Sequence, residues 1–123
     1  MVLFEFVKNN THDVMMPDIK YSGGPDEMIE LNKFFSKYNI EFSPHNPSGP
    51  IAHAHSIQIC SVSTPCLLEY QYKESDKFDS IMNILNTPII NSKVRTATSE
   101  KGLGVSINME NLLKEDINSH KTQ

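Results

Sequence analysis

The chain has 123 residues, of which 38% are hydrophobic and 21% charged, and its formal net charge is -4. This length suits a single soluble domain or a piece of a larger one, and no apolar run approaches the roughly 20 residues of a membrane span. Lys and Arg are scattered through an acidic chain, which argues against a nucleic-acid partner. The N-terminus lacks the pattern of a secretion signal, so we expect a cytoplasmic protein that makes no membrane contact.

The first part of the sequence alternates between helical and strand-like patterns. Gly24 and Gly49 each precede a proline, and proline suits the first position of a helix. Behind Pro25, apolar residues recur at helical spacing as far as Tyr38, and behind Pro50 they cover most of the circumference. The expected elements are a helix end at 2–10, a strand at 13–16, a helix from 25, a strand at 40–42, a helix at 50–62 and a strand at 66–68.

The helix at 50–62 has little polar surface, and we therefore expect it to lie between other elements. Its apolar residues are Ile51, Ala52, Ala54, Ile57, Ile59 and Val62.

The remaining sequence is less strongly patterned. A helical stripe runs through Phe78, Ile81, Met82 and Leu85, and residues 88–94 suit an extended segment. The glycine-rich EKGLGVSIN segment predicts a turn into a short strand. Asn108 then suits the cap of a last short helix through Leu113. We expect one folded unit over residues 1–113 and a mobile polar tail over 114–123.

Asp18, His45 and Glu69 each follow a short apolar strand, at intervals of about 25 residues, the size of one strand-plus-helix unit. Repeated units of this kind predict an α/β fold with a parallel sheet, in which right-handed crossovers place all three side chains at one edge. Three units do not close into a barrel, since an eightfold barrel takes about 250 residues.

Each of these three residues also has a structural interpretation. Asp18 suits an Asx-turn, and a single histidine such as His45 is more often structural than catalytic. Glu69 directly follows Leu67 and Leu68, so we expect it to be partly buried and to need a partner. Their equal spacing favours the functional interpretation.

The combination suits proton abstraction. A histidine held by an aspartate is fixed in one tautomer and can take up a proton near neutral pH. A protonated glutamate could hydrogen-bond the charge that develops on a substrate oxygen. Removal of a proton next to a carboxylate forms an enolate, which normally requires a divalent metal as well.

Three segments carry a family resemblance: MPDIKYSGG (16–24), SPHNPSGPIA (43–52) and LLEYQ (67–71). They resemble the last three strand ends of the mandelate racemase branch of the enolase superfamily, and PHNPSGPIA is most similar to galactonate dehydratase-like sugar-acid dehydratases. The resemblance covers about the first hundred residues, and EKGLGVSIN is similar to the glycine-rich C-terminal segment of the family. It implies a C-terminal fragment of a modified TIM barrel, with the last three βα units followed by the C-terminal segment.

The resemblance implies a role for each polar residue at a strand end. His45 matches the general base or acid, Asp18 its paired aspartate, and Glu69 the glutamate that hydrogen-bonds the substrate carboxylate or enediolate. The implied reaction of the full-length parent, a hydro-lyase, is magnesium-assisted loss of water from a sugar acid to give a 2-keto-3-deoxy acid. The Mg²⁺ ligands of the family lie on earlier strands, so we assign no metal ligand in this chain and expect no turnover from it alone. We expect the parent to be a homo-oligomer.

Two other classes of function remain open. The parent could be a racemase or epimerase of the same superfamily, or the chain could be a non-catalytic remnant or interaction module.

Two pairs of residues favour structural interpretations. His53 and His55 lie two residues apart on one helix and point to different faces, so packing or solvation is favoured over a metal site. Cys60 and Cys66 lack metal-site spacing, and buried reduced thiols are favoured over a disulfide.

Overall fold

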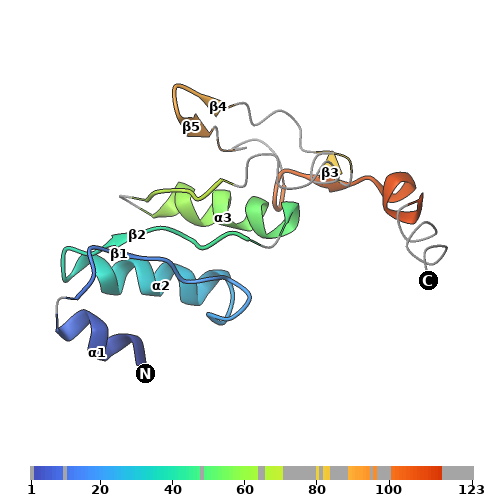
Figure 1. Cartoon of the computed structure of the whole chain (residues 1–123). Coiled ribbons are helices and arrows are strands. Elements are labelled where there is room, and N and C mark those ends of the chain that lie inside the picture. Colours follow the sequence, from blue (N-terminus) through green and yellow to red (C-terminus); the bar gives the residue numbers. More distant parts are fainter. Residues whose placement is uncertain are drawn as a thin grey trace.

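Figure 1 shows the computed structural model, which describes residues 2–9, 11–47, 49–63, 66–70, 80, 82–83, 89–94, 96 and 101–114. Helices and short strands alternate through the first part of the chain, as predicted. The elements are α1 (Val2–Lys8), β1 (Val14–Met15), α2 (Pro25–Ser36), β2 (Glu41–Phe42), α3 (Pro50–Val62), β3 (Met82–Asn83), β4 (Ile89–Ile90), β5 (Lys93–Val94) and β6 (Ser106–Ile107).

The two longest helices begin in the same way. Gly24 and Gly49 occupy the N-cap positions with φ of 97° and 88°, a backbone conformation that side chains with a Cβ rarely adopt. Pro25 and Pro50 then fill the first helical position, where their lack of an N–H costs no hydrogen bond. The predicted bounds of α3 are confirmed, whereas α2 ends at Ser36, so that Tyr38 lies outside the helix.

β1 and β2 form a parallel pair, in which Val14 is opposite Glu41 and Met15 is opposite Phe42. The predicted third strand is reduced to one parallel bridge between Phe42 and Cys66, with the Leu67 N–H donating to the Phe42 carbonyl at 3.2 Å. Parallel pairing of consecutive strands requires a crossover connection, which α2 provides between β1 and β2. The predicted α/β fold is therefore confirmed.

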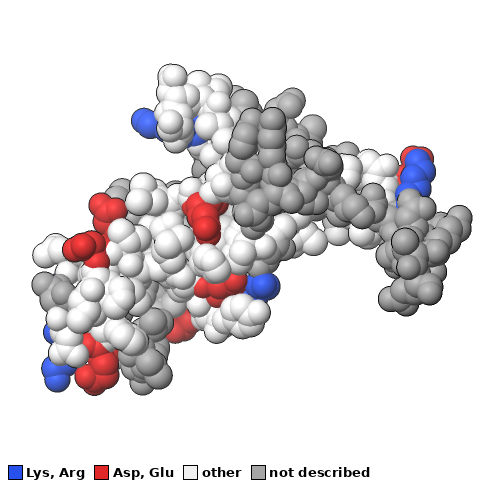
Figure 2. Space-filling view, viewed as in Figure 1, with Lys and Arg blue, Asp and Glu red and all other residues white. Residues whose placement is uncertain are grey.

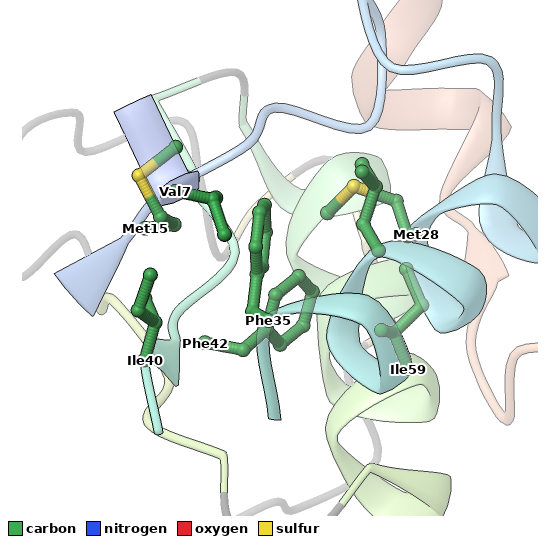
Figure 3. Close-up of a cluster of buried hydrophobic side chains, with 8 residues drawn as sticks. Val7, Met15, Met28, Phe35, Ile40, Phe42 and Ile59 are labelled. Carbon is green, nitrogen blue, oxygen red and sulfur yellow. The ribbon is translucent and has the colours of Figure 1, made fainter. Parts of the chain in front are cut away.

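The hydrophobic core lies where α2 packs against β2 and α3 (Figure 3). Phe35 and Phe42, at 0% and 1% exposure, form its centre with ring centroids 6.4 Å apart. α1 contributes Val7, which is 2% exposed. The buried cluster comprises Val7, Met15, Met28, Leu31, Phe35, Ile40, Phe42 and Ile59.

α3 is less enclosed than its composition predicts. Ile51 and Val62, at opposite ends of the helix, are 47% and 65% exposed, whereas the polar residues His53 and Ser56 are buried. Ser56 satisfies its hydroxyl within the helix by donating to the Ala52 carbonyl at 3.0 Å. The expectation of a helix with little polar or solvated surface is therefore wrong at both ends, and its buried face is partly polar.

The predicted helical stripe after residue 77 is wrong at Met82, because Met82–Asn83 form β3, which pairs antiparallel with β6. Phe78, Ile81 and Leu85 lie outside the described residues. The backbone pairing of β3 with β6 joins segments more than twenty residues apart in the chain, and helical periodicity carries no information about such a partner.

The other segments after residue 88 agree better with the sequence. The predicted extended segment is a hairpin of β4 and β5, whose turn residues Asn91 and Ser92 have φ of 51° and 60°. The glycine-rich segment leads into β6, as predicted. Asn108 caps the last helix, at 109–114, by accepting a hydrogen bond from the Asn111 N–H at 3.1 Å. This helix includes Lys114, and residues 115–123 of the predicted tail lie outside the described residues.

Candidate active site

Asp18 and His45 lie just beyond the paired strands β1 and β2, and they extend the parallel sheet by one bridge. The His45 N–H donates to the Pro17 carbonyl at 3.0 Å, which holds the two loops side by side. Asp18 and His45 therefore lie together at the carboxyl end of the sheet, as their repeated spacing in the sequence predicted.

The two oxygens of the Asp18 carboxylate have different surroundings. Oδ1 accepts a hydrogen bond from the Lys20 N–H at 2.8 Å, which is the Asx-turn that the sequence suggested. Oδ2 lies 3.7 Å from His45 Nδ1, within ion-pair distance but beyond a direct hydrogen bond. Asp18 is 8% exposed and the His45 side chain is 44% exposed. The structural and functional interpretations of Asp18 are thus compatible, because each uses one oxygen.

Glu69 joins the same edge through the residue that follows His45. Its Oε2 accepts a hydrogen bond from the Asn46 N–H at 2.6 Å. The Asn46 side chain also donates to the Glu69 carbonyl, with Nδ2 at 3.2 Å from the oxygen. The predicted partner of the half-buried Glu69 is therefore found, and the three predicted residues lie on adjoining loops.

Asn46 and His53 connect these loops to α3. Asn46 is 1% exposed, and its Nδ2 lies 2.7 Å from His53 Nδ1. Because Nδ2 also donates to the Glu69 carbonyl, Asn46 is the donor to His53, and the proton of the neutral ring is on Nε2. Asn46 Oδ1 is buried and has no partner among the described residues. Asn46 was not among the predicted site residues, and its position between His45 and Pro47 was the only available signal.

The ring of His53 is enclosed. It is 2% exposed and meets Tyr70 edge to face, with ring centroids 5.0 Å apart. Burial lowers the pKa of His53 below its ordinary value of 6.5, because the positive imidazolium is poorly solvated there. The expectation of a packed His53 is therefore confirmed, and His55 is half-buried on the same helix.

We expect the buried His53 to make the protein less stable in acid. Its pKa is lower in the folded than in the unfolded chain, so the unfolded chain takes up more protons as the pH falls through about 6.5. The free energy of unfolding should therefore fall as the pH is lowered from about 6.5 to the folded-state pKa of His53. The expected slope is up to about 1.4 kcal/mol per pH unit. Urea unfolding at a series of pH values between about 7.5 and 5 would measure this slope.

His53→Gln should reduce this slope while keeping an acceptor for the Asn46 amide. The matched control is Ser56→Ala, a change at a buried position of the same helix that cannot titrate. An unchanged slope in His53→Gln would show that other groups cause the acid sensitivity.

A cavity of about 370 Å³ lies between the loop after Asp18 and the start of α3, and is lined by Ile19, Lys20, Pro25, Ile51, Ala52 and His55.

The described part of the chain contains no group of three or more His, Cys, Asp or Glu side chains that could hold a metal. On the face shown in Figure 2, acidic and basic side chains are dispersed, with no continuous basic stripe among the described residues.

A family model described as "Enolase C-terminal domain-like" matches residues 2–111, nearly the whole chain. The chain belongs to this family. The inference of an enolase-superfamily relationship from the three strand-end segments is therefore confirmed.

Relatives of this enolase C-terminal domain-like chain include proteins named D-galactonate dehydratase. The protein from Xanthomonas campestris pv. campestris is 32% identical over 107 residues, which are 82% of this chain and 28% of the relative. The proteins from Xanthomonas euvesicatoria pv. vesicatoria and Variovorax paradoxus are 30% and 26% identical, over 85% and 81% of this chain and 29% and 28% of theirs. The chain thus spans less than a third of the length of these relatives.

A solved structure shares the fold. The mandelate racemase/muconate lactonizing enzyme-like protein from Rubrobacter xylanophilus superposes with a TM-score of 0.78 at 23% identity, over 89% of this chain and 28% of that protein. Among the residues described for our chain, no helix has the length and hydrophobicity needed to cross a bilayer.

Proposed function

We propose that the chain provides the last three βα units of a modified TIM barrel in a magnesium-dependent sugar-acid dehydratase. The observation that carries this proposal is that Asp18, His45 and Glu69 lie on adjoining loops at one edge of a parallel sheet, with Asp18 paired to His45 and Glu69 bonded to Asn46. The relatives named D-galactonate dehydratase support dehydration, and D-galactonate is the first substrate to test.

The orientation of His45 suits proton transfer to and from a substrate. Its Nδ1 faces the Asp18 carboxylate, so Nε2 is the ring nitrogen directed away from it. With 44% of its side chain exposed, the ring is open to a reactant at the carboxyl end of the strands. Its position 3.7 Å from the buried Asp18 carboxylate suits His45 to accept a proton from the α-carbon. The same group can instead protonate the departing β-hydroxyl.

Glu69 is held for a second role. The hydrogen bond from the Asn46 N–H to Oε2 fixes the carboxyl group against the loop that carries His45. A fixed carboxyl group at this position suits recognition of the substrate carboxylate or of the enediolate formed from it. Because Asn46 also binds His53, rigid α3 supports the loop that carries both His45 and Asn46.

The described residues do not themselves fit the magnesium ion of the proposed enzyme. Hard cations such as Mg²⁺ require several oxygen ligands, whereas Asp18 Oδ1 and Glu69 Oε2 are engaged by backbone N–H groups. We therefore place the ion on other residues of the complete enzyme and assign it no step here. In the proposed enzyme, Asp18, His45 and Glu69 handle protons and orient the substrate.

Product analysis of the full-length protein that contains this chain tests the proposal. With D-galactonate and Mg²⁺, we expect a 2-keto-3-deoxy acid, and the Xanthomonas campestris relative serves as the positive control. An epimerised sugar acid without loss of water would instead assign racemase or epimerase chemistry to the same residues. If neither product formed and no α-proton exchanged with solvent across a panel of sugar acids, the enzymatic proposal would be overturned.

A further inference from the structure

Two thiols outside the candidate active site are closer than an ordinary contact between sulfur atoms. Cys60 lies in the last turn of α3, and Cys66 forms the single parallel bridge to Phe42. Their Sγ atoms are 2.6 Å apart, and both residues are half-buried free cysteines. A disulfide bond is about 2.05 Å long, so oxidation requires a movement of only about 0.6 Å.

We propose that Cys60 and Cys66 form a reversible intrachain disulfide that ties the end of α3 to the segment, residues 66–68, that leads into Glu69. The sequence favoured buried reduced thiols, whereas in the structure the two free cysteines are only half-buried. The close approach of the two Sγ atoms is a property that their spacing in the sequence did not predict. This inference concerns a modification site and does not depend on the proposed catalytic activity.

The oxidant is a small-molecule disulfide such as oxidised glutathione. The Cys66 thiolate attacks one sulfur of the oxidant, which releases one glutathione thiolate and leaves a mixed disulfide on Cys66. Cys60 then loses its proton to solvent and attacks Cys66 Sγ, which releases the second glutathione. Two protein thiols are oxidised to one disulfide, and one molecule of oxidised glutathione is reduced to two of glutathione.

The local chemistry suits Cys66 as the attacking group. The hydrogen bond that the two thiols share lowers the pKa of Cys66 and, together with burial, raises the pKa of Cys60. Cys60 thus keeps its proton and can donate it toward a Cys66 thiolate. A thiolate stabilised in this way is the reactive form in exchange with a disulfide.

The thiols are reached through a cavity of about 570 Å³ between α3, residues 66–70 and the β4–β5 hairpin. Cys60 and Cys66 both line it, together with apolar side chains that include Ile57 and Leu67. Lys93 contributes a positive charge to the lining, which suits an oxidant that carries carboxylates. The cavity provides a route for a tripeptide-sized reagent.

The reaction can be followed in the complete chain, because Cys60 and Cys66 are its only cysteines. In buffers of increasing oxidised-to-reduced glutathione ratio, we expect both thiols to disappear together. The product should be a monomer on a non-reducing gel, lighter by two hydrogen atoms, and reversible with dithiothreitol. Closure of the loop should raise the Tm by roughly 5 °C.

Cys60→Ser and Cys66→Ser are matched single-thiol controls. Cys60→Ser keeps a hydroxyl donor beside Cys66, so we expect it to accumulate the mixed disulfide on Cys66 at least about threefold faster than Cys66→Ser does on Cys60. Neither variant should show the Tm increase.

Some results would overturn the proposal. These are two independent mixed disulfides per wild-type chain, covalent dimers as the main product, or thiols that stay reduced while the single-cysteine variants react. A disulfide that forms with no change in Tm would overturn the inferred tie between α3 and residues 66–68.

Discussion

His45→Asn in the full-length protein is expected to abolish exchange of the substrate α-proton with solvent and to lower kcat by about 10³-fold or more. General acid–base groups typically contribute about 10²- to 10⁴-fold, and His45 is the histidine at the strand edge that faces a buried carboxylate. Asparagine keeps a polar group of similar reach but cannot accept a proton. Deuterium incorporation from heavy water, followed by mass spectrometry, measures the exchange directly.

The matched control is His12→Asn, at an exposed position outside the proposed site. His12→Asn should leave kcat and the exchange of the α-proton unchanged. Both variants should unfold at the same urea concentration as the unsubstituted full-length protein. Undiminished exchange in His45→Asn would remove His45 from its proposed role, even if the overall reaction were slowed at another step.

Phe35→Ala is expected to produce the largest loss of stability among single changes in the described core, about 3–5 kcal/mol. Phe35 is 0% exposed and contacts the ring of Phe42, so truncation leaves a cavity between α2 and the sheet. Since natural domains have about 5–15 kcal/mol of unfolding free energy, this change would remove a large fraction. Urea unfolding monitored by circular dichroism measures it.

Phe6→Ala is the same substitution at a position that is 45% exposed, on α1. It should cost less than half as much, because water already reaches part of the Phe6 ring and the ring packs edge to face on the exposed His12. Equal decreases in stability for the two variants would contradict a core centred on Phe35.

Short-range signals predicted most of the fold before residue 70. The Gly–Pro pairs at 24–25 and 49–50 start α2 and α3, since the glycine backbone and the fixed proline φ act within two residues. The strands were short but bounded by polar and proline residues. Which apolar residues of α3 are covered was not predictable, and Ile51 and Val62 are exposed because nothing in the described part of the chain covers them.

The positions of the candidate site residues were also predictable from a pattern in the sequence. The regular spacing of Asp18, His45 and Glu69 was sufficient to place them at one edge, because equivalent positions of repeated βα units converge. The connection through Asn46 was not predictable. Asn46 links its own loop to His53 of α3 and to Glu69, and each of these hydrogen bonds spans at least seven residues.

By itself, the sequence determined the family, the α/β alternation, the starts of α2 and α3, and which three polar residues meet at the strand ends. All of these depend on local backbone preferences and on a repeat that can be counted. Tertiary structure alone decided the pairing of β3 with β6, the burial of His53 beneath Asn46, and the approach of Cys60 to Cys66. These contacts depend on how separate segments pack, and the free energy of such packing is not encoded in any one segment.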